Sequence, residues 1–199
     1  MGIKKIFFKL RQLKSDVINR INFRYYGVRV GKLTGHIEGI ITIRSARKES
    51  IIIGDRAELR SGKSYNIIGG DTRLILRTIG DGKITIGDHV GISNSALVSA
   101  ASIKIEDDVM IGGSCKIWDT DFHSICFEDR NRTKDHDYQS KSICIKRGAF
   151  IGGGCIILKG VTIGEKSIVG AGSVVTKSIP SGEIWAGNPA RFIKKLRNK

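Results

Sequence analysis

Residues 145–175, IKRGAFIGGGCIILKGVTIGEKSIVGAGSVV, place an aliphatic side chain at every sixth position. These positions are Ile145, Ile151, Ile157, Ile163, Val169 and Val175. Compact residues recur four positions after each of the first five, at Ala149, Cys155, Val161, Ser167 and Ser173. A period of six does not fit a helical turn, but it fits a short strand followed by a corner, with alternate side chains facing inward. The segment is therefore predicted to form stacked short strands with two inward positions per repeat.

Three such repeats make one triangular coil, and a run of them is typical of a parallel β-helix, whose coils bury their inner face only by stacking. The same phase occurs upstream at Ile86, Ile92 and Val98, slips by one residue, and resumes at Ile105, Ile111 and Ile117, with weaker matches at Ile53 and Leu59. Burial of six aliphatic side chains contributes roughly 9 to 18 kcal/mol before chain entropy is subtracted. Packing alone explains these positions, so the repeat by itself is also compatible with a passive binding module.

The six-residue rhythm stops between Ile117 and Ile145. The intervening segment is polar and contains Asp119, Asp121, His123, Glu128, Asp129, Asp135, His136 and Asp137. Functional side chains are commonly carried on long loops that project from a rigid scaffold. We therefore predict that residues 118–144 leave the coil as a loop that carries the site.

The repeats, this interruption and the ending GAGSVVTKSIPSGEIWAGNPARFIKKL (residues 170–196) together resemble the hexapeptide-repeat acyltransferases, most nearly their sugar and polysaccharide O-acetyltransferase branch. The resemblance extends from about residue 51 to residue 196. It implies a left-handed parallel β-helix, acetyl-CoA as the acyl donor, and a homotrimer with active sites between subunits.

Transfer of an acetyl group to a hydroxyl requires a base that removes the hydroxyl proton, and imidazole, with an unperturbed pKa near about 6.5, suits this task. The family's base is a histidine in this loop, and the match at DTDFH (residues 119–123) places it on His123. Either Asp119 or Asp121 is close enough in sequence to fix the tautomer of the ring. His136, in the charged stretch KDHDYQSK (residues 134–141), is interpreted as a solvated loop residue.

The resemblance also implies contacts to both substrates. Asn94 matches an asparagine that contacts the acceptor, although a turn would use asparagine equally well, and Phe150 replaces a tryptophan that often lines the acyl pocket. A backbone N–H near Gly153 is expected to meet the thioester oxygen. Coenzyme A is expected to contact Ala171, Thr176, Lys177, Arg191 and Lys194. The alternative is that the glycines only turn corners and that the basic side chains are solvated.

No metal site is predicted, because His36, His89, His123 and His136 are scattered. Carbonic anhydrases of the gamma class share the coil but bind zinc through three histidines, two of them a few residues apart; here Trp118 and Glu128 flank His123 at that distance. Four cysteines without a C-x-x-C pair fit reduced thiols. Cys115 and Cys155 occupy equivalent inward positions, so direct transfer without a covalent acyl-enzyme is expected.

Most of the net charge of +15 lies at the two ends of the chain. Residues 3–21 place Ile3, Phe7, Leu10, Val17 and Ile21 at helical spacing among lysines and arginines. This pattern predicts a basic amphipathic helix. It could lie on an anionic membrane surface or pack against the coil of its own or a neighbouring subunit, and packing is the favoured interpretation. No nucleic-acid-binding motif is present.

The expected fold is all-β, with a basic helical segment at residues 1–30, a β-helix at 31–190 with its loop at 118–144, and a basic tail at 191–199. The expected activity is acetyl transfer to a hydroxyl of a sugar or surface polysaccharide precursor. The alternatives are N-acetylation of a nucleotide-linked amino sugar, acetylation of a small molecule or antibiotic, and a binding module without turnover. No apolar stretch is long enough to span a bilayer and no signal peptide is evident, so a cytoplasmic location is expected, with peripheral membrane contact left open.

Overall fold

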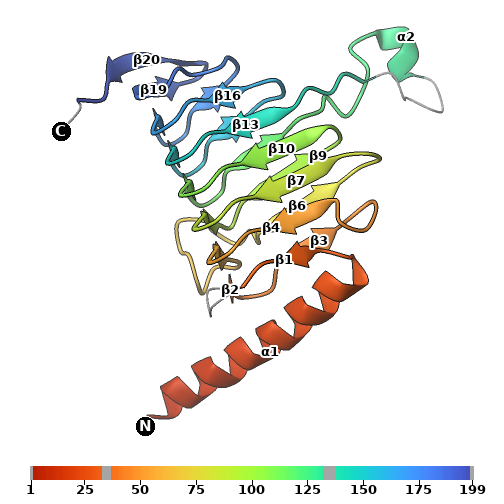
Figure 1. Cartoon of the computed structure of the whole chain (residues 1–199), viewed down its shortest axis with the longest axis vertical. Coiled ribbons are helices and arrows are strands. Elements are labelled where there is room, and N and C mark those ends of the chain that lie inside the picture. The colour runs from red at the N-terminus through yellow and green to blue at the C-terminus, as the bar shows by residue number, and fades with distance from the viewer. Residues whose placement is uncertain (1, 33–36, 132–137, 198–199) are drawn as a thin grey trace.

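The short strands form three parallel sheets that are the walls of a triangular prism (Figure 1). The computed structural model describes residues 2–32, 37–131 and 138–197. Consecutive strands of the coil fall on successive walls, and each strand pairs with the strand one coil earlier and one coil later. The fold is the predicted left-handed parallel β-helix with a helix at its N-terminal end.

Each wall can be followed along the prism. Wall A contains β1 (Arg29–Val30), β4 (Ile51–Ile53), β7 (Lys83–Ile86), β10 (Ser102–Ile105), β13 (Ile143–Ile145) and β16 (Thr162–Ile163). Wall B contains β2 (Ile37–Glu38), β5 (Glu58–Arg60), β8 (Gly91–Ser93), β11 (Met110–Ile111), β14 (Phe150–Ile151), β17 (Ile168–Val169), β19 (Glu183–Gly187) and β20 (Ala190–Lys195). Wall C contains β3 (Thr42–Arg44), β6 (Ile75–Thr78), β9 (Ala96–Ser99), β12 (Lys116–Trp118), β15 (Ile156–Ile157) and β18 (Val174–Val175).

The inward side chains stack in columns along the prism. Ile145 pairs with Ile105 and Ile163 in wall A, because parallel strands in register place equivalent residues one above the other. The six aliphatic positions from residue 145 to residue 175 are all fully buried, and the five compact positions between them are at most 1% exposed. The predicted two inward positions per repeat are confirmed.

One predicted inward position is wrong. Val98 is half-buried on the outer side of β9, and Leu97 takes the inward place, in register with Leu76 and Ile117. The corner before β9 is one residue shorter than the next corner in the stack, because Ser93 and Asn94 precede Ser95 where Gly112, Gly113 and Ser114 precede Cys115. The turn between β9 and β10 is in contrast two residues longer than the turn between β15 and β16, because Ile105 follows Leu97 by eight positions and Ile163 follows Ile157 by six. The shorter corner and the longer turn together give the one-residue slip in phase.

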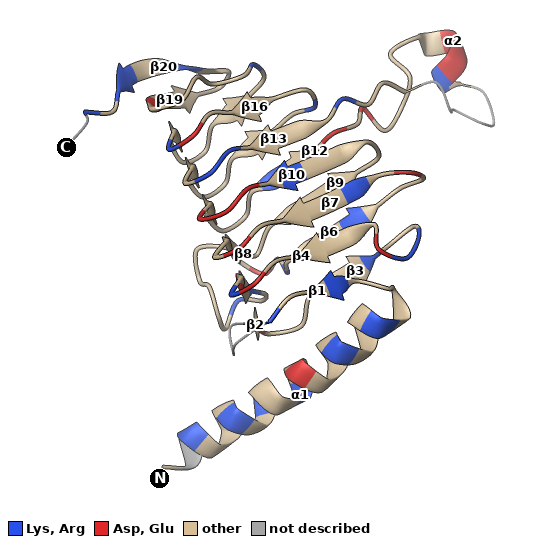
Figure 2. Cartoon of the chain, in the orientation of Figure 1, with Lys and Arg blue, Asp and Glu red and all other residues tan. Residues whose placement is uncertain are grey.

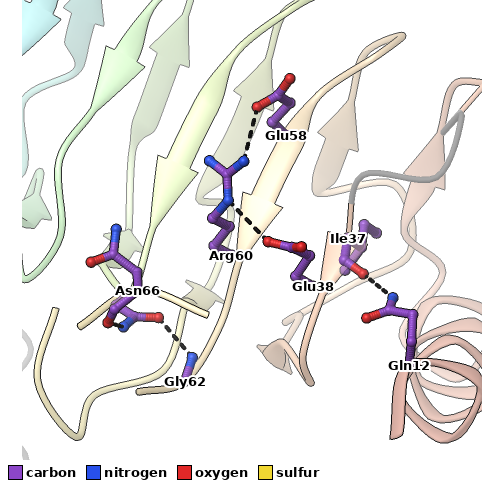
Figure 3. Close-up of polar contacts among 8 residues, drawn as sticks. Gln12, Ile37, Glu38, Glu58, Arg60, Gly62 and Asn66 are labelled. Carbon is purple, nitrogen blue, oxygen red and sulfur yellow. Dashed lines mark hydrogen bonds and ion pairs between the residues drawn. The ribbon is translucent and has the colours of Figure 1, made fainter. Parts of the chain in front are cut away.

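Helix α1 (Ile3–Tyr25) crosses the N-terminal end of the prism (Figure 1). The side chain of Asn19 is buried, and it donates to the carbonyl oxygen of Gly39 (2.9 Å) and accepts from the N–H of Ile41 (3.0 Å). Gln12 Nε2 donates to the carbonyl oxygen of Ile37 in β2 (Figure 3). The helix thus closes the end of its own coil.

The C-terminal end of the prism is closed by a hairpin. β19 continues wall B in parallel with β17, and β20 returns antiparallel to β19. Residues 191–195, which the sequence analysis assigned to a basic tail, lie in this strand. Trp185 in β19 packs against the buried core. Within the described residues, no helix is both long and apolar enough to cross a membrane.

Candidate active site

The chain leaves the prism after β12, at the corner where wall C meets wall A, and returns at β13 (Figure 1). The two legs of this loop pair with each other, through an antiparallel bridge between Thr120 and Ser140 and a hydrogen bond from Asp121 N–H to the carbonyl oxygen of Gln139 (3.0 Å). Helix α2 (Phe127–Arg130) lies farther out. The loop predicted at 118–144 occupies 119–142, and His136 lies outside the described residues.

Asp119 stands at the base of the loop and is fully buried. Its carboxylate accepts hydrogen bonds from Ser99 Oγ (2.6 Å), the N–H of Ala100 (2.6 Å) and the N–H of Ala101 (3.1 Å). Ser99 is the last residue of β9, one coil below, and the other two donors belong to the turn that follows it. Asp119 therefore joins the base of the loop to the preceding coil, and a role in orienting His123 stays a prediction.

Asp121 lies one step farther along the same leg. Its Oδ2 atom is 3.0 Å from Lys159 Nζ, and both side chains are about one quarter exposed. Lys159 comes from the turn after β15, one coil above the base of the loop. The ion pair therefore ties the loop to the following coil. The sequence analysis missed Lys159, because only the stacking of coils brings it to this corner.

His123 is exposed, two residues beyond Asp121. The preceding residue, Phe122, has φ +64, a left-handed conformation that bulky residues rarely adopt. The ring of Phe122 lies 6.4 Å from that of Trp118, the last residue of β12. This ring contact ties the turn that carries His123 to the end of β12. The other left-handed non-glycine residues lie in turns between strands of the coil itself.

Asn94 lies at the opposite edge of wall C, at the corner with wall B, and it is 1% exposed. Its Oδ1 accepts a hydrogen bond from the N–H of Gly62 (2.7 Å), and its Nδ2 donates one to the carbonyl oxygen of Asn66 (2.9 Å). Gly62 and Asn66 are labelled in Figure 3. Both ends of the amide thus hold the segment 61–74, an insertion between β5 and β6. The amide of Asn94 thus has a structural role at this turn, and contact with an acceptor stays a prediction.

The insertion at residues 61–74 runs along the corner between walls B and C, toward the C-terminal coils. Ser114 Oγ donates to the carbonyl oxygen of Gly69 (3.0 Å), and a Cβ at Gly113 would lie 2.7 Å from the nitrogen of Gly69, so this approach requires glycine. Higher up, Ile68 Cγ2 would lie 3.5 Å from a Cβ at Gly153. Ile68 is 79% exposed. The sequence analysis missed this residue, although an exposed Ile-Ile pair in a polar segment was a usable signal.

Gly153 and Ala171 lie at this same corner in successive coils. Gly172 N–H donates to the carbonyl oxygen of Gly153 (2.9 Å), and Ala171 is exposed directly beside it. Arg191 in β20 lies opposite Ala186 in β19. The preceding residue of β19, Trp185, accepts a hydrogen bond at its carbonyl oxygen from the N–H of Gly170 (2.8 Å). Phe150 precedes the corner on wall B and is 45% exposed. The corner therefore offers backbone and apolar surface with the guanidinium of Arg191 at its upper end. Lys194 is also exposed, but it lies farther along β20, opposite Ile184 at the start of β19.

Comparison with known proteins agrees with the architecture. Residues 145–177 match the model of the bacterial transferase hexapeptide, described as six repeats. The matched segment lies within the part of the chain that carries the regular six-residue repeat. A crystal structure of a hexapeptide-repeat acetyltransferase from Vibrio cholerae, complexed with acetyl coenzyme A, is similar to it with a TM-score of 0.59 and 29% identity, over 73% of this chain and 71% of that one.

The curated relatives of the chain include proteins of two kinds. A Schizosaccharomyces pombe protein named "Putative acetyltransferase" is 39% identical over 106 residues, covering 53% of this chain and 49% of that protein. The mitochondrial gamma carbonic anhydrase 2 of Arabidopsis thaliana is 32% identical over 151 residues, covering 74% of this chain and 46% of that protein. The chain spans about half the length of these two relatives.

The predicted site residues fall into two sets within one chain. Asp121 and the base of the His123 loop share the corner of walls C and A with Thr176 and Lys177, which follow β18 and are exposed. Gly153, Ala171 and Arg191 lie at or above the corner of walls B and C. The width of wall C separates the two sets, so the structure of one chain does not bring all predicted residues together.

The stacked cysteines Cys115 and Cys155 lie inside the prism. Cys115 and Cys155 are at most 1% exposed, and their Sγ atoms donate to the carbonyl oxygens of Gly152 and Gly170, both at 3.1 Å. The hydrogen bond to the Cys155 thiol and burial raise the pKa of Cys115. Neither sulfur reaches the surface, which is consistent with direct acyl transfer.

Among residues 2–32, 37–131 and 138–197, no group of three or more His, Cys, Asp or Glu side chains is placed to hold a metal ion. His36 and His136 lie outside those residues. His89 forms a contact of 3.6 Å with Asp108 at the far corner of walls A and B, well away from His123 in the fold.

Proposed function

We propose that the protein is an acetyl-CoA dependent O-acetyltransferase that acts on a hydroxyl of a sugar or of a surface polysaccharide precursor. The observation that carries the proposal is an exposed histidine on a braced loop of a hexapeptide-repeat transferase. Asp119 and Asp121 tie this loop to the coil below and the coil above, and an exposed glycine corner with a basic strand above it provides surface for a donor.

In the proposed reaction, His123 takes the proton of the acceptor hydroxyl as its oxygen attacks the thioester carbonyl. A backbone N–H at the Gly153 corner would stabilise the charge that develops on the carbonyl oxygen, an interaction worth about 3 kcal/mol when well aimed. The carbon–sulfur bond then breaks, the thiolate of coenzyme A takes the proton from the imidazolium, and the products are an acetyl ester and a free thiol. Lys177, Arg191 and Lys194 supply charge for the phosphates of the nucleotide.

The proposed assembly is a homotrimer. Since wall C separates the two sets of predicted residues in one chain, the corner that carries His123 has to meet the donor corner of a neighbouring copy. A three-fold arrangement of prisms with parallel axes provides three such sites, because each copy contributes one corner of each kind.

The first test measures thiol release from acetyl-CoA with a panel of sugars, amino sugars and amine-bearing drugs. The proposal predicts turnover with a sugar hydroxyl and a product whose acetyl group is removed by hydroxylamine, as an ester is. A stable amide product would support N-acetylation instead. Absence of thiol release with every acceptor, or hydration of carbon dioxide by zinc-loaded protein, would contradict the proposal.

The second test replaces His123 by Ala. Loss of the general base is expected to lower kcat roughly 100- to 10,000-fold, with unchanged thermal unfolding because the side chain is exposed. His89→Asn is the matched control, since asparagine tolerates the left-handed backbone at that position (φ +54). Near-normal turnover of the His123 variant would remove this residue from the mechanism.

A further inference from the structure

Helix α1 exposes a continuous apolar stripe on the side that faces away from the coil. The stripe consists of Ile6, Leu10, Leu13, Val17 and Ile21, whose side chains are 44–61% exposed. The buried residues of the helix are Ser15, Asn19 and Phe23. At about 100° per residue, the centres of the two sets lie on opposite sides of the helix. The stripe is therefore not needed to close the prism.

Both flanks of the stripe are basic. The helix carries seven Lys/Arg and a single Asp, and Figure 2 shows the blue segments along its whole length. An open hollow of about 600 Å³ adjoins one flank and contains Arg20, Arg24, Arg29, Lys48 and one acid, Glu49, among its lining residues. A second hollow, of about 370 Å³, adjoins the other flank and contains Arg11, Lys14, Lys63, Arg73 and one acid, Asp71. The two hollows together are lined by eight cations and two carboxylates, and Asp71 is ion-paired with Lys63.

We propose that α1 lies in the interface of an anionic lipid bilayer, with the stripe among the acyl chains and the two hollows against lipid phosphates. A helix with a narrow apolar face, a basic polar face and too little hydrophobicity to span is typical of interfacial anchors. The occupant is not a second copy of the same helix, because two surfaces with this excess of positive charge repel each other.

The position of α1 at the end of the prism is compatible with binding to a flat bilayer surface. α1 crosses the end of the prism, so its outer face points along the prism axis, away from the coils (Figure 1). Copies that associate side by side through their walls would all present this face in the same direction. They can then contact one plane together, but their stripes cannot contact one another. This inference does not depend on the proposed acetyl transfer.

The experiment is sedimentation of the full-length protein with lipid vesicles. Binding to vesicles containing phosphatidylglycerol is expected to be at least tenfold tighter than to neutral phosphatidylcholine vesicles, and to weaken as salt is raised. Arg20→Gln/Arg24→Gln should weaken binding about 30-fold, since each basic residue near the surface contributes roughly fivefold. Arg44→Gln/Arg77→Gln, which removes two exposed charges from wall C, should leave binding within about twofold.

The apolar stripe is tested separately with Leu10→Ser/Val17→Ser. This variant should lose at least tenfold in vesicle affinity with unchanged thermal unfolding, because both side chains are half exposed and face away from the coil. Phe192→Ser/Ile193→Ser, at the opposite end of the prism, should bind as the wild type does. Equal binding to both vesicle types, unchanged binding of the stripe variant, or a stripe variant that changes only the oligomeric state would overturn the proposal.

Discussion

At the scale of single residues, the structure separates two carboxylates that look equivalent in the sequence. Asp119 is fully buried with three hydrogen-bond donors from the preceding coil, whereas Asp121 forms a partly exposed ion pair with Lys159. A buried carboxylate with three hydrogen-bond donors stabilises the fold, because its removal leaves those donors unpaired. Asp121, which adjoins the His123 turn, remains the better placed of the two to affect catalysis.

We expect Asp119→Ala to lower the free energy of unfolding by about 2 to 4 kcal/mol, because three hydrogen bonds to a charged group are lost in a buried site. Asp121→Asn should change the free energy of unfolding by less than about 1 kcal/mol, since partly exposed ion pairs contribute little. Urea denaturation of both variants measures the difference. Equal stability of the two variants would contradict the structural assignment of Asp119.

Ile68 is expected to form part of the donor surface, because the insertion holds it above Gly153. Ile68→Ala should raise the KM for acetyl-CoA by about tenfold with little change in kcat, since it removes apolar contact to the donor and leaves the reacting groups intact. Ile67→Ala is the neighbouring control, with an expected change of less than about twofold. A KM unchanged by the Ile68 variant would show that the donor lies elsewhere.

At the scale of elements, stability depends on columns of inward side chains shared by neighbouring coils. Ile151 stacks between Ile111 and Val169 in wall B, so its side chain serves three coils at once. Ile168, on the same wall, faces outward and is only partly buried. The burial difference, rather than the residue type, decides the cost of substitution.

Ile151→Ala should therefore destabilise the protein by about 2 to 5 kcal/mol, the range found for cavities in packed cores. Ile168→Ala should cost less than about 1.5 kcal/mol, because the site stays in contact with solvent or a neighbouring copy. Thermal unfolding of the two variants provides the comparison. If both had the same effect, the column would not be the unit that stabilises the prism.

At the scale of the whole molecule, the proposed sites between copies make a specific prediction. His123→Ala removes the base, and Ala171→Glu places a carboxylate and added bulk on the exposed donor corner. Each variant alone should be nearly inactive. Mixed trimers assembled from both should regain roughly a quarter of wild-type activity, because one site in four combines the intact corner of each chain. No recovery on mixing would indicate that each site lies within one chain.

The sequence alone was sufficient to predict the coil and the place of its interruption. Hexad positions such as Ile145 and Ile151 face inward in any coil of three strands, because strand alternation and corner length are local properties. The same reasoning failed at Val98, where the corner is one residue shorter and the inward place passes to Leu97.

Stacking of coils decided the rest, because it brings together residues that lie far apart in the chain. It places Lys159 within ion-pair distance of Asp121 and lets the amide of Asn94 hydrogen-bond to the insertion at residues 61–74. It also brings Ile68 close to Gly153. It also separated the predicted site residues across wall C and turned the apolar stripe of α1 away from the prism. These contacts depend on the register between coils, which no local pattern encodes.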